Sequence, residues 1–138
     1  MHVVAAPDKF RGTASALEVA TAVERAVAEH GGTTAVLPMA DGGEGTLEAL
    51  GGPNQTSLVT GPLGGLIEAP WQLTGTTAII EMAKASGLIT IGGPEFNEVL
   101  NATSAGTGEL ILSAVEHGAT RIIVGLGGSA STDGGLGA

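Results

Sequence analysis

Four acidic residues lie in or beside glycine-rich segments, close to where short apolar runs end: Asp8, Asp41, Glu44 and Asp133. Carboxylates in such loops suit Mg²⁺, which usually takes one or two protein carboxylates and fills its other positions with water and substrate phosphates. The same side chains also close Asx turns and cap helices. The pattern therefore indicates either a metal–nucleotide site, with Asp41 and Asp133 as candidate metal ligands, or structural turn residues.

A second chemical signal follows the last apolar run, residues 122–124. The segment 125–130 (GLGGSA) has the form G-x-G-x-x-A, in which glycines let backbone N–H groups approach a phosphate. Gly127, Gly128 and Ser129 are therefore candidate anion- or nucleotide-binding residues, and a tight turn between packed elements is the alternative. An ordinary P-loop is excluded from these 138 residues, because neither Lys9 nor Lys84 follows a glycine.

Charged and sulfur-containing residues limit the possible partners and compartments. The formal net charge of −9 argues against a nucleic-acid surface. Lys9 and Arg11 share one loop beside Asp8, where they either neutralise the charge of a ligand or lie in solvent. The chain has no cysteine, its start has no basic n-region, and no apolar run approaches membrane-spanning length. We expect a soluble, cytoplasmic protein that binds a small molecule.

Glu81 ends an apolar run and is a candidate of a different kind. A carboxyl group buried at the end of a strand needs a partner for its charge. A substrate-site acid and a satisfied structural acid fit the pattern equally well.

The elements that must position these residues alternate between strand and helix. Residues 3–6 predict a first strand, a capping box from Ser15 to Glu18 begins a helix over 16–29, and residues 35–38 predict a second strand. A short helix over 47–50 and a strand over 56–60 follow. We place a domain boundary in the turn-rich segment near residue 62, giving segments 1–62 and 63–138.

The second segment predicts a hairpin about residues 74–75, with Pro70 making its first strand an edge strand. A short helix over 82–85, a helix opened by residues 103–108 and ended by Gly118, and a strand over 121–124 complete it. The chain is therefore predicted to be an α/β protein, with a parallel or mixed sheet, flanking helices and a Rossmann-like arrangement.

Six blocks together resemble the bacterial class I glycerate kinase family in order and spacing. The blocks are residues 6–12 (APDKFRG), 40–46 (ADGGEGT), 61–64 (GPLG), 80–88 (IEMAKASGL), 106–111 (GTGELI) and 127–135 (GGSASTDGG). The resemblance covers all 138 residues. One departure is Ala105, where the family often has a larger Arg or Tyr before the Gly-Thr-Gly-Glu sequence.

The resemblance implies a two-domain α/β kinase that transfers the γ-phosphoryl group of ATP, with Mg²⁺, to the 2- or the 3-hydroxyl of D-glycerate. The chain corresponds to the N-terminal part of such a protein, so we expect a fragment that is inactive alone. Asp41, Asp133 and Lys9 are the candidate catalytic residues. The candidate substrate- and nucleotide-binding residues are Asp8, Arg11, Gly42, Gly43, Glu44, Glu81, Ser104, Gly106, Thr107, Gly127, Gly128 and Ser129.

Two other functions compete with this interpretation. The G-x-G-x-x-A spacing also suits half of a nicotinamide-dinucleotide-binding oxidoreductase. A module that binds an anion without turnover is the non-enzymatic alternative.

Overall fold

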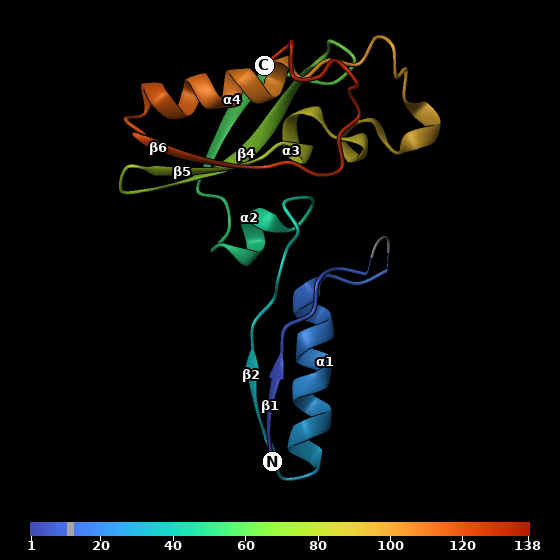
Figure 1. Ribbon diagram of the computed structural model, residues 1–138, viewed down its shortest axis with the longest axis vertical. Coiled ribbons are helices and arrows are strands. Elements are labelled where there is room, and N and C mark those ends of the chain that lie inside the picture. The colour runs from blue at the N-terminus through green and yellow to red at the C-terminus, as the bar shows by residue number, and fades with distance from the viewer. Residues whose placement is uncertain (11–12) are drawn as a thin grey trace. The chain divides into compact units, whose positions relative to one another are not determined.

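The computed structural model describes residues 1–10 and 13–138, which form two compact units, Met1–Asp41 and Gly42–Ala138 (Figure 1). The division predicted between segments 1–62 and 63–138 stays a prediction. Within this chain, the strand that precedes residue 62 pairs with the strand that follows it. No helix among the described residues has the length and apolar character needed to cross a bilayer.

The first unit is the predicted β–α–β arrangement. Strand β1 (His2–Ala5) and strand β2 (Thr33–Val36) pair in parallel, and α1 (Ala16–Glu29) connects them. The predicted capping box starts the helix, because the backbone N–H of Glu18 donates to Ser15 Oγ at 3.2 Å and the Glu18 carboxylate accepts from the Ser15 backbone at 2.7 Å. Ala20 and Val27 are the buried residues of α1.

The second unit is built on a mixed four-stranded sheet. Strands β3 (Gln55–Thr60), β4 (Leu66–Thr74) and β5 (Thr77–Glu81) are antiparallel neighbours, and β6 (Arg121–Gly125) adds to β5 in parallel. Before β3 comes α2 (Thr46–Ala49). Between β5 and β6 lie α3 (Ala83–Ser86), the 3-10 turns η1 (Leu88–Ile91) and η2 (Pro94–Phe96), and α4 (Ala105–Glu116). The predicted mixed α/β class is confirmed.

The prediction that β4 is an edge strand is wrong, because β4 lies between β3 and β5. Pro70 nevertheless fits there. It pairs with Thr56 of β3, while only Gln72–Thr74 of β4 pair with β5. Its missing N–H therefore removes no hydrogen bond from the β4–β5 ladder.

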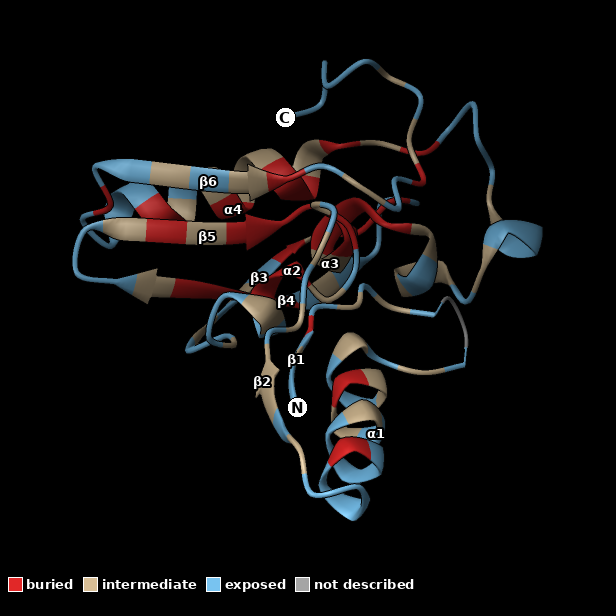
Figure 2. Cartoon of the chain, turned by 60° about the horizontal axis from the view of Figure 1, so that its bottom comes forward, coloured by how far each residue is buried: buried red, intermediate tan, exposed pale blue. Residues whose placement is uncertain are grey.

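The core of the second unit lies between the sheet and α4, where the buried positions of β4, β5 and α4 face one another (Figure 2). Trp71 is its largest member and is fully buried. The indole N–H donates to Ser57 Oγ at 3.0 Å, and the ring meets His117 edge-on with centroids 5.5 Å apart. Leu110 and Ala114 are the α4 residues buried in this core.

Candidate functional site

The loop that carries the predicted residues Gly127, Gly128, Ser129 and Asp133 begins at the carboxyl end of β6, beside the end of β5. Glu81 and Gly125 are the last pair of that parallel ladder, and the Met82 backbone N–H donates to the Gly125 carbonyl at 3.1 Å. The segment after β6 is fixed to the end of α3, since Leu88 N–H donates to the Gly128 carbonyl and Ala130 N–H to the Ser86 carbonyl, both at 2.9 Å. Residues 126–138 contain no helix.

Two glycine-rich loops pack backbone against backbone at this edge of the sheet. A Cβ atom on Gly125 would lie 2.6 Å from the Gly42 carbonyl oxygen, and one on Gly127 would lie 2.5 Å from the Gly43 Cα. Only glycine allows these approaches. The structure therefore gives a packing reason for Gly125 and Gly127, and Gly42 has a φ of 91° that favours glycine, whether or not these residues also contact a ligand.

Beside these loops lies an open cavity of about 320 Å³. The predicted residues Ser104, Thr107, Ser129 and Asp133 line it, together with residues the sequence analysis did not select. Those are Met82, Leu126, Ser131, Gly134, Gly135 and Ala138. The hydroxyl-rich run 129–132 was the available sequence signal for Ser131.

Asp133 is held by four hydrogen bonds, two from Ser104 and two from its own loop. Its Oδ2 accepts from the backbone N–H and the hydroxyl of Ser104, both at 2.8 Å, and from the Gly137 N–H at 3.3 Å, while Oδ1 accepts from the Gly135 N–H at 3.0 Å. The hydrogen bonds from Ser104 lower the pKa of this carboxyl to about 2. Asp133 is thus an ionised carboxylate that ties the last loop to the start of α4.

The start of α4 is attached to α3 and to β3. Thr107 Oγ1 and Ser86 Oγ form a buried hydrogen bond of 2.9 Å. The Glu109 carboxylate accepts from the backbone and hydroxyl of Thr60 at 2.6 and 2.7 Å. Gly106 lies against the Thr60 carbonyl so closely that a Cβ atom has no room. The Gly-Thr-Gly-Glu block therefore has a packing role in addition to lining the cavity through Thr107.

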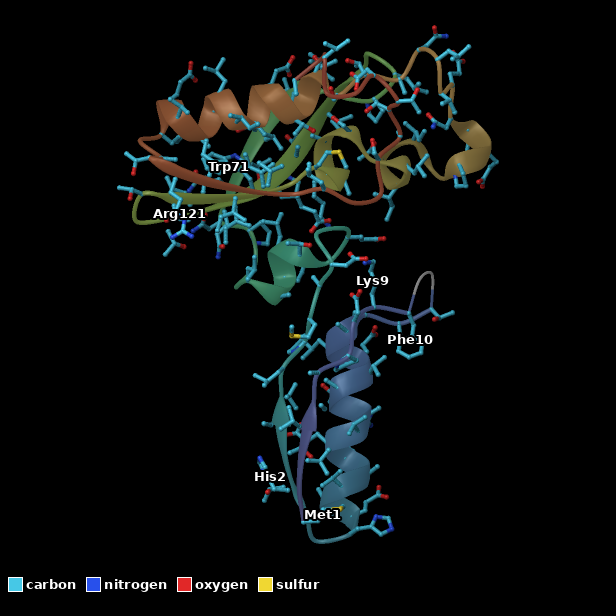
Figure 3. The ribbon with its side chains drawn as sticks, viewed as in Figure 1. Met1, His2, Lys9, Phe10, Trp71 and Arg121 are labelled. Carbon is cyan, nitrogen blue, oxygen red and sulfur yellow. The ribbon has the colours of Figure 1, made fainter. Side chains whose placement is uncertain are left out.

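In the first unit, the loops after β1 and β2 bring Asp8, Lys9 and Asp41 together. Lys9 Nζ lies 3.0 Å from Asp41 Oδ1 and 3.8 Å from Asp8 Oδ1, and Asp8 also accepts from the Lys9 backbone at 2.7 Å. Figure 3 labels Lys9 in the segment between β1 and α1. The Lys9 side chain is 16% exposed and the Asp41 side chain 53%. Arg11, the other predicted cation, lies outside the described residues.

Glu81 does not line the cavity; it is fully buried beneath α2. Its Oε2 accepts from the Leu47 N–H at 3.1 Å, and its Oε1 lies 3.8 Å from Lys84 Nζ. Burial raises the pKa of Glu81, and the Leu47 backbone and the Lys84 ammonium partly oppose that shift. Glu44 is exposed in the neighbouring loop.

The sequence as a whole matches known proteins of one kind. The family model described as the glycerate kinase family covers residues 3–138. Relatives named glycerate 2-kinase, from Escherichia coli, and glycerate kinase, from Bacillus subtilis, are 48% and 45% identical over 99% of this chain. The crystal structure of a glycerate kinase 2 from Salmonella typhimurium LT2 is 46% identical over 99% of the chain, with a TM-score of 0.78.

The chain belongs to the glycerate kinase family. It spans about 38% of the length of these relatives, in agreement with the expectation that it is one part of a longer kinase sequence. The family resemblance inferred from the six blocks is thereby confirmed. The dinucleotide fingerprint, in contrast, requires a helix after its glycines, and none lies within residues 126–138.

The carboxylates of this family member suit a Mg²⁺ ion that is bound by only one or two protein side chains. No group of three His, Cys, Asp or Glu side chains gathers among the residues that the structure describes. A Mg²⁺ ion that completes its coordination with phosphates and water needs only one or two carboxylates. Asp41, which is largely exposed, and Asp133, whose Oδ1 carries a single hydrogen bond among the contacts found, both suit that role.

Proposed function

We propose that the chain is the N-terminal part of a glycerate kinase, which transfers the γ-phosphoryl group of ATP to a hydroxyl of D-glycerate. The observation that carries this proposal is the family match over residues 3–138. The names of the relatives support glycerate as the acceptor. Because the chain spans about 38% of their length, the activity is a property of the longer protein.

The two groups of polar residues would serve different parts of the reaction. Phosphoryl transfer depends mainly on positioning and on stabilising charge, rather than on a covalent nucleophile. The hydroxyls of Ser104, Thr107 and Ser129 would orient a substrate or phosphate in the cavity. Lys9 would face an anionic group, and Arg11 would supply a second positive charge. Asp41 or Asp133 would hold Mg²⁺, which when bound neutralises charge on the transferred group.

The net charge and the cysteine content of the chain also bear on its partners and its compartment. The net charge of −9 favours small-molecule partners over nucleic acid. The lack of cysteine suits a cytoplasmic enzyme.

A chimera tests the proposal directly. Residues 1–138 would replace the matching segment of the Escherichia coli glycerate 2-kinase, and ATP turnover would be measured with and without glycerate. We expect glycerate-dependent turnover that falls at least about 100-fold in Asp41→Asn or Asp133→Asn, because each removes a charge needed in the transition state. Glu116→Gln, at an exposed position of α4, is the matched control.

Four results would contradict the proposal. One is a folded chimera that does not phosphorylate glycerate, and another is near-normal turnover in both Asp variants. The third is binding of NAD without ATP, which would favour the oxidoreductase alternative. Tight binding of an anion with no phosphorylated product would instead favour the non-catalytic module.

A further inference from the structure

Glu81 makes two attachments at the carboxyl edge of the sheet, one through its backbone and one through its side chain. Its backbone is paired with Gly125, where the loop after β6 begins. Its carboxylate reaches Leu47, a residue 34 positions earlier in the chain, at 3.1 Å. One residue therefore links the segment that follows Gly42 with the segment that follows Gly125.

The hydrogen bond to Leu47 fills a gap at the start of α2. The residue before this helix is Gly45, which has no side chain to cap the free N–H groups and has φ of 94°. Helix starts normally receive such a cap from a nearby Ser, Thr, Asp or Asn. Here the acceptor comes from β5. Thr46 closes the same turn by donating from its hydroxyl to the Gly43 carbonyl at 2.6 Å.

The loop that α2 follows is also the one in backbone contact with residues 125–127. Gly42 and Gly43 lie against Gly125 and Gly127, neither of which has room for a Cβ atom. Fixing Leu47 therefore limits how far the 42–46 loop can move away from the loop after β6. The two glycine-rich loops are held as a single preformed surface.

The charge of Glu81 and its hydrogen bond have different partners. Lys84 Nζ lies 3.8 Å from Glu81 Oε1 and 3.6 Å from Glu48 Oε1, and the Lys84 side chain is 24% exposed. Among the described residues, Glu81 Oε1 accepts no hydrogen bond. The directional contacts of the buried carboxylate are therefore with backbone N–H groups at the start of α2, those of Leu47 and Gly45.

We propose that Glu81 is a positioning residue, whose buried carboxylate holds the 42–46 loop against the 125–127 loop so that both present their backbones to the substrates together. It does so by accepting a hydrogen bond from the Leu47 N–H, without touching the reacting atoms. This inference rests on the proposed function for its catalytic consequence. The attachment itself is a property of the 138-residue chain.

Two substitutions separate the hydrogen bond from the charge. Glu81→Gln keeps the length of the side chain and an acceptor oxygen for Leu47, but removes the charge. Glu81→Asp keeps the charge and withdraws the carboxylate by about 1.5 Å, one carbon–carbon bond, out of reach of Leu47. Glu68→Gln and Glu68→Asp, at an exposed position of β4, are the matched controls.

Amide hydrogen exchange in the 138-residue chain measures the attachment. We expect the Leu47 amide to exchange at least about tenfold faster in Glu81→Asp than in Glu81→Gln, with both Glu68 variants unchanged. In the chimera, kcat should fall at least about tenfold in Glu81→Asp while KM changes less than about threefold, and Glu81→Gln should retain most of kcat. A residue that acts through its charge would give the opposite order.

The outcomes distinguish this inference from the proposed function. Greater impairment of Glu81→Gln than of Glu81→Asp, or a Leu47 amide in the unsubstituted chain that exchanges like an exposed loop amide, would overturn the positioning role. The exchange rate of the Leu47 amide in the unsubstituted chain tests the positioning role even where a variant does not fold. An unsubstituted chimera that fails to phosphorylate glycerate would sink the proposed function and leave the exchange result standing.

Discussion

The two units of the chain hold their functional residues in different ways. In Met1–Asp41, one parallel strand pair and one helix support a group of charged side chains, in which Lys9 lies between Asp8 and Asp41. In Gly42–Ala138, a four-stranded sheet with a core around Trp71 supports loops whose contacts are mainly through the backbone. The Asp8 and Asp41 side chains are 43% and 53% exposed and can adjust to a ligand, whereas packed glycine loops are preformed.

This difference also concerns stability. The first unit buries two residues of its helix, and its strands are four residues each. The second buries nine core residues, which include Trp71, Ile80 and Leu110. Because burial of apolar surface is the main favourable term in folding, we expect the second unit to be the more stable of the two.

The largest effect should come from the core of the second unit. Trp71→Ala removes a fully buried indole and its hydrogen bond to Ser57, so we expect a loss of about 3–5 kcal/mol in the free energy of unfolding. Chemical denaturation followed by circular dichroism measures it. Leu112→Ala, at a position 57% exposed on α4, should change this free energy by less than about 0.5 kcal/mol. Equal losses in the two variants would contradict the assignment of the core.

A smaller effect should appear in the first unit. Ser15→Ala removes the acceptor for the Glu18 N–H and should destabilise α1 by about 1 kcal/mol. Hydrogen exchange should speed up in α1 and stay unchanged in β4 and β5. Glu24→Ala, at an exposed position of the same helix, is the control. If exchange in β4 and β5 rose equally, the two units would unfold together and the comparison between them would fail.

The smallest effect should be a response of the second unit to acid. The pKa of Asp133 is lowered from 3.8 to about 2 by its hydrogen bonds with Ser104. A lowered pKa means that the ionised form is stabilised by folding, so this contribution is complete above about pH 4 and is lost as the pH falls towards 2. The unfolding temperature should decrease as the pH falls from 5 to 2. This decrease should be shallower in Asp133→Asn. An identical pH profile in that variant would contradict the role of these hydrogen bonds.

Local signals in the sequence were sufficient for several elements. The capping box from Ser15 to Glu18 predicted the helix at Ala16–Glu29 because its hydrogen bonds join residues three apart. The hairpin about Gly75 was predicted from a turn between two apolar runs, and its strands pair as expected. The prediction for Pro70 failed, because the position of a strand within a sheet depends on strands far away in the sequence.

The candidate site was predictable in its residue types and less so in its contacts. Ser104, Thr107, Ser129 and Asp133 line one cavity, and their contacts with a substrate stay a prediction. Nothing near Glu81 in the sequence indicated Leu47 as its partner. Likewise, nothing in the segment 125–130 indicated that its glycines would pack against Gly42 and Gly43.

The sequence alone determined the family, the α/β class and the positions of glycine, acid and hydroxyl residues, because these depend on residue order and on interactions within a few positions. The tertiary structure decided which segments meet: the 42–46 loop with the 125–127 loop, Glu81 with Leu47, and Asp133 with Ser104. Those contacts join residues 29 to 85 positions apart, and they form only when the sheet brings its carboxyl ends to one edge.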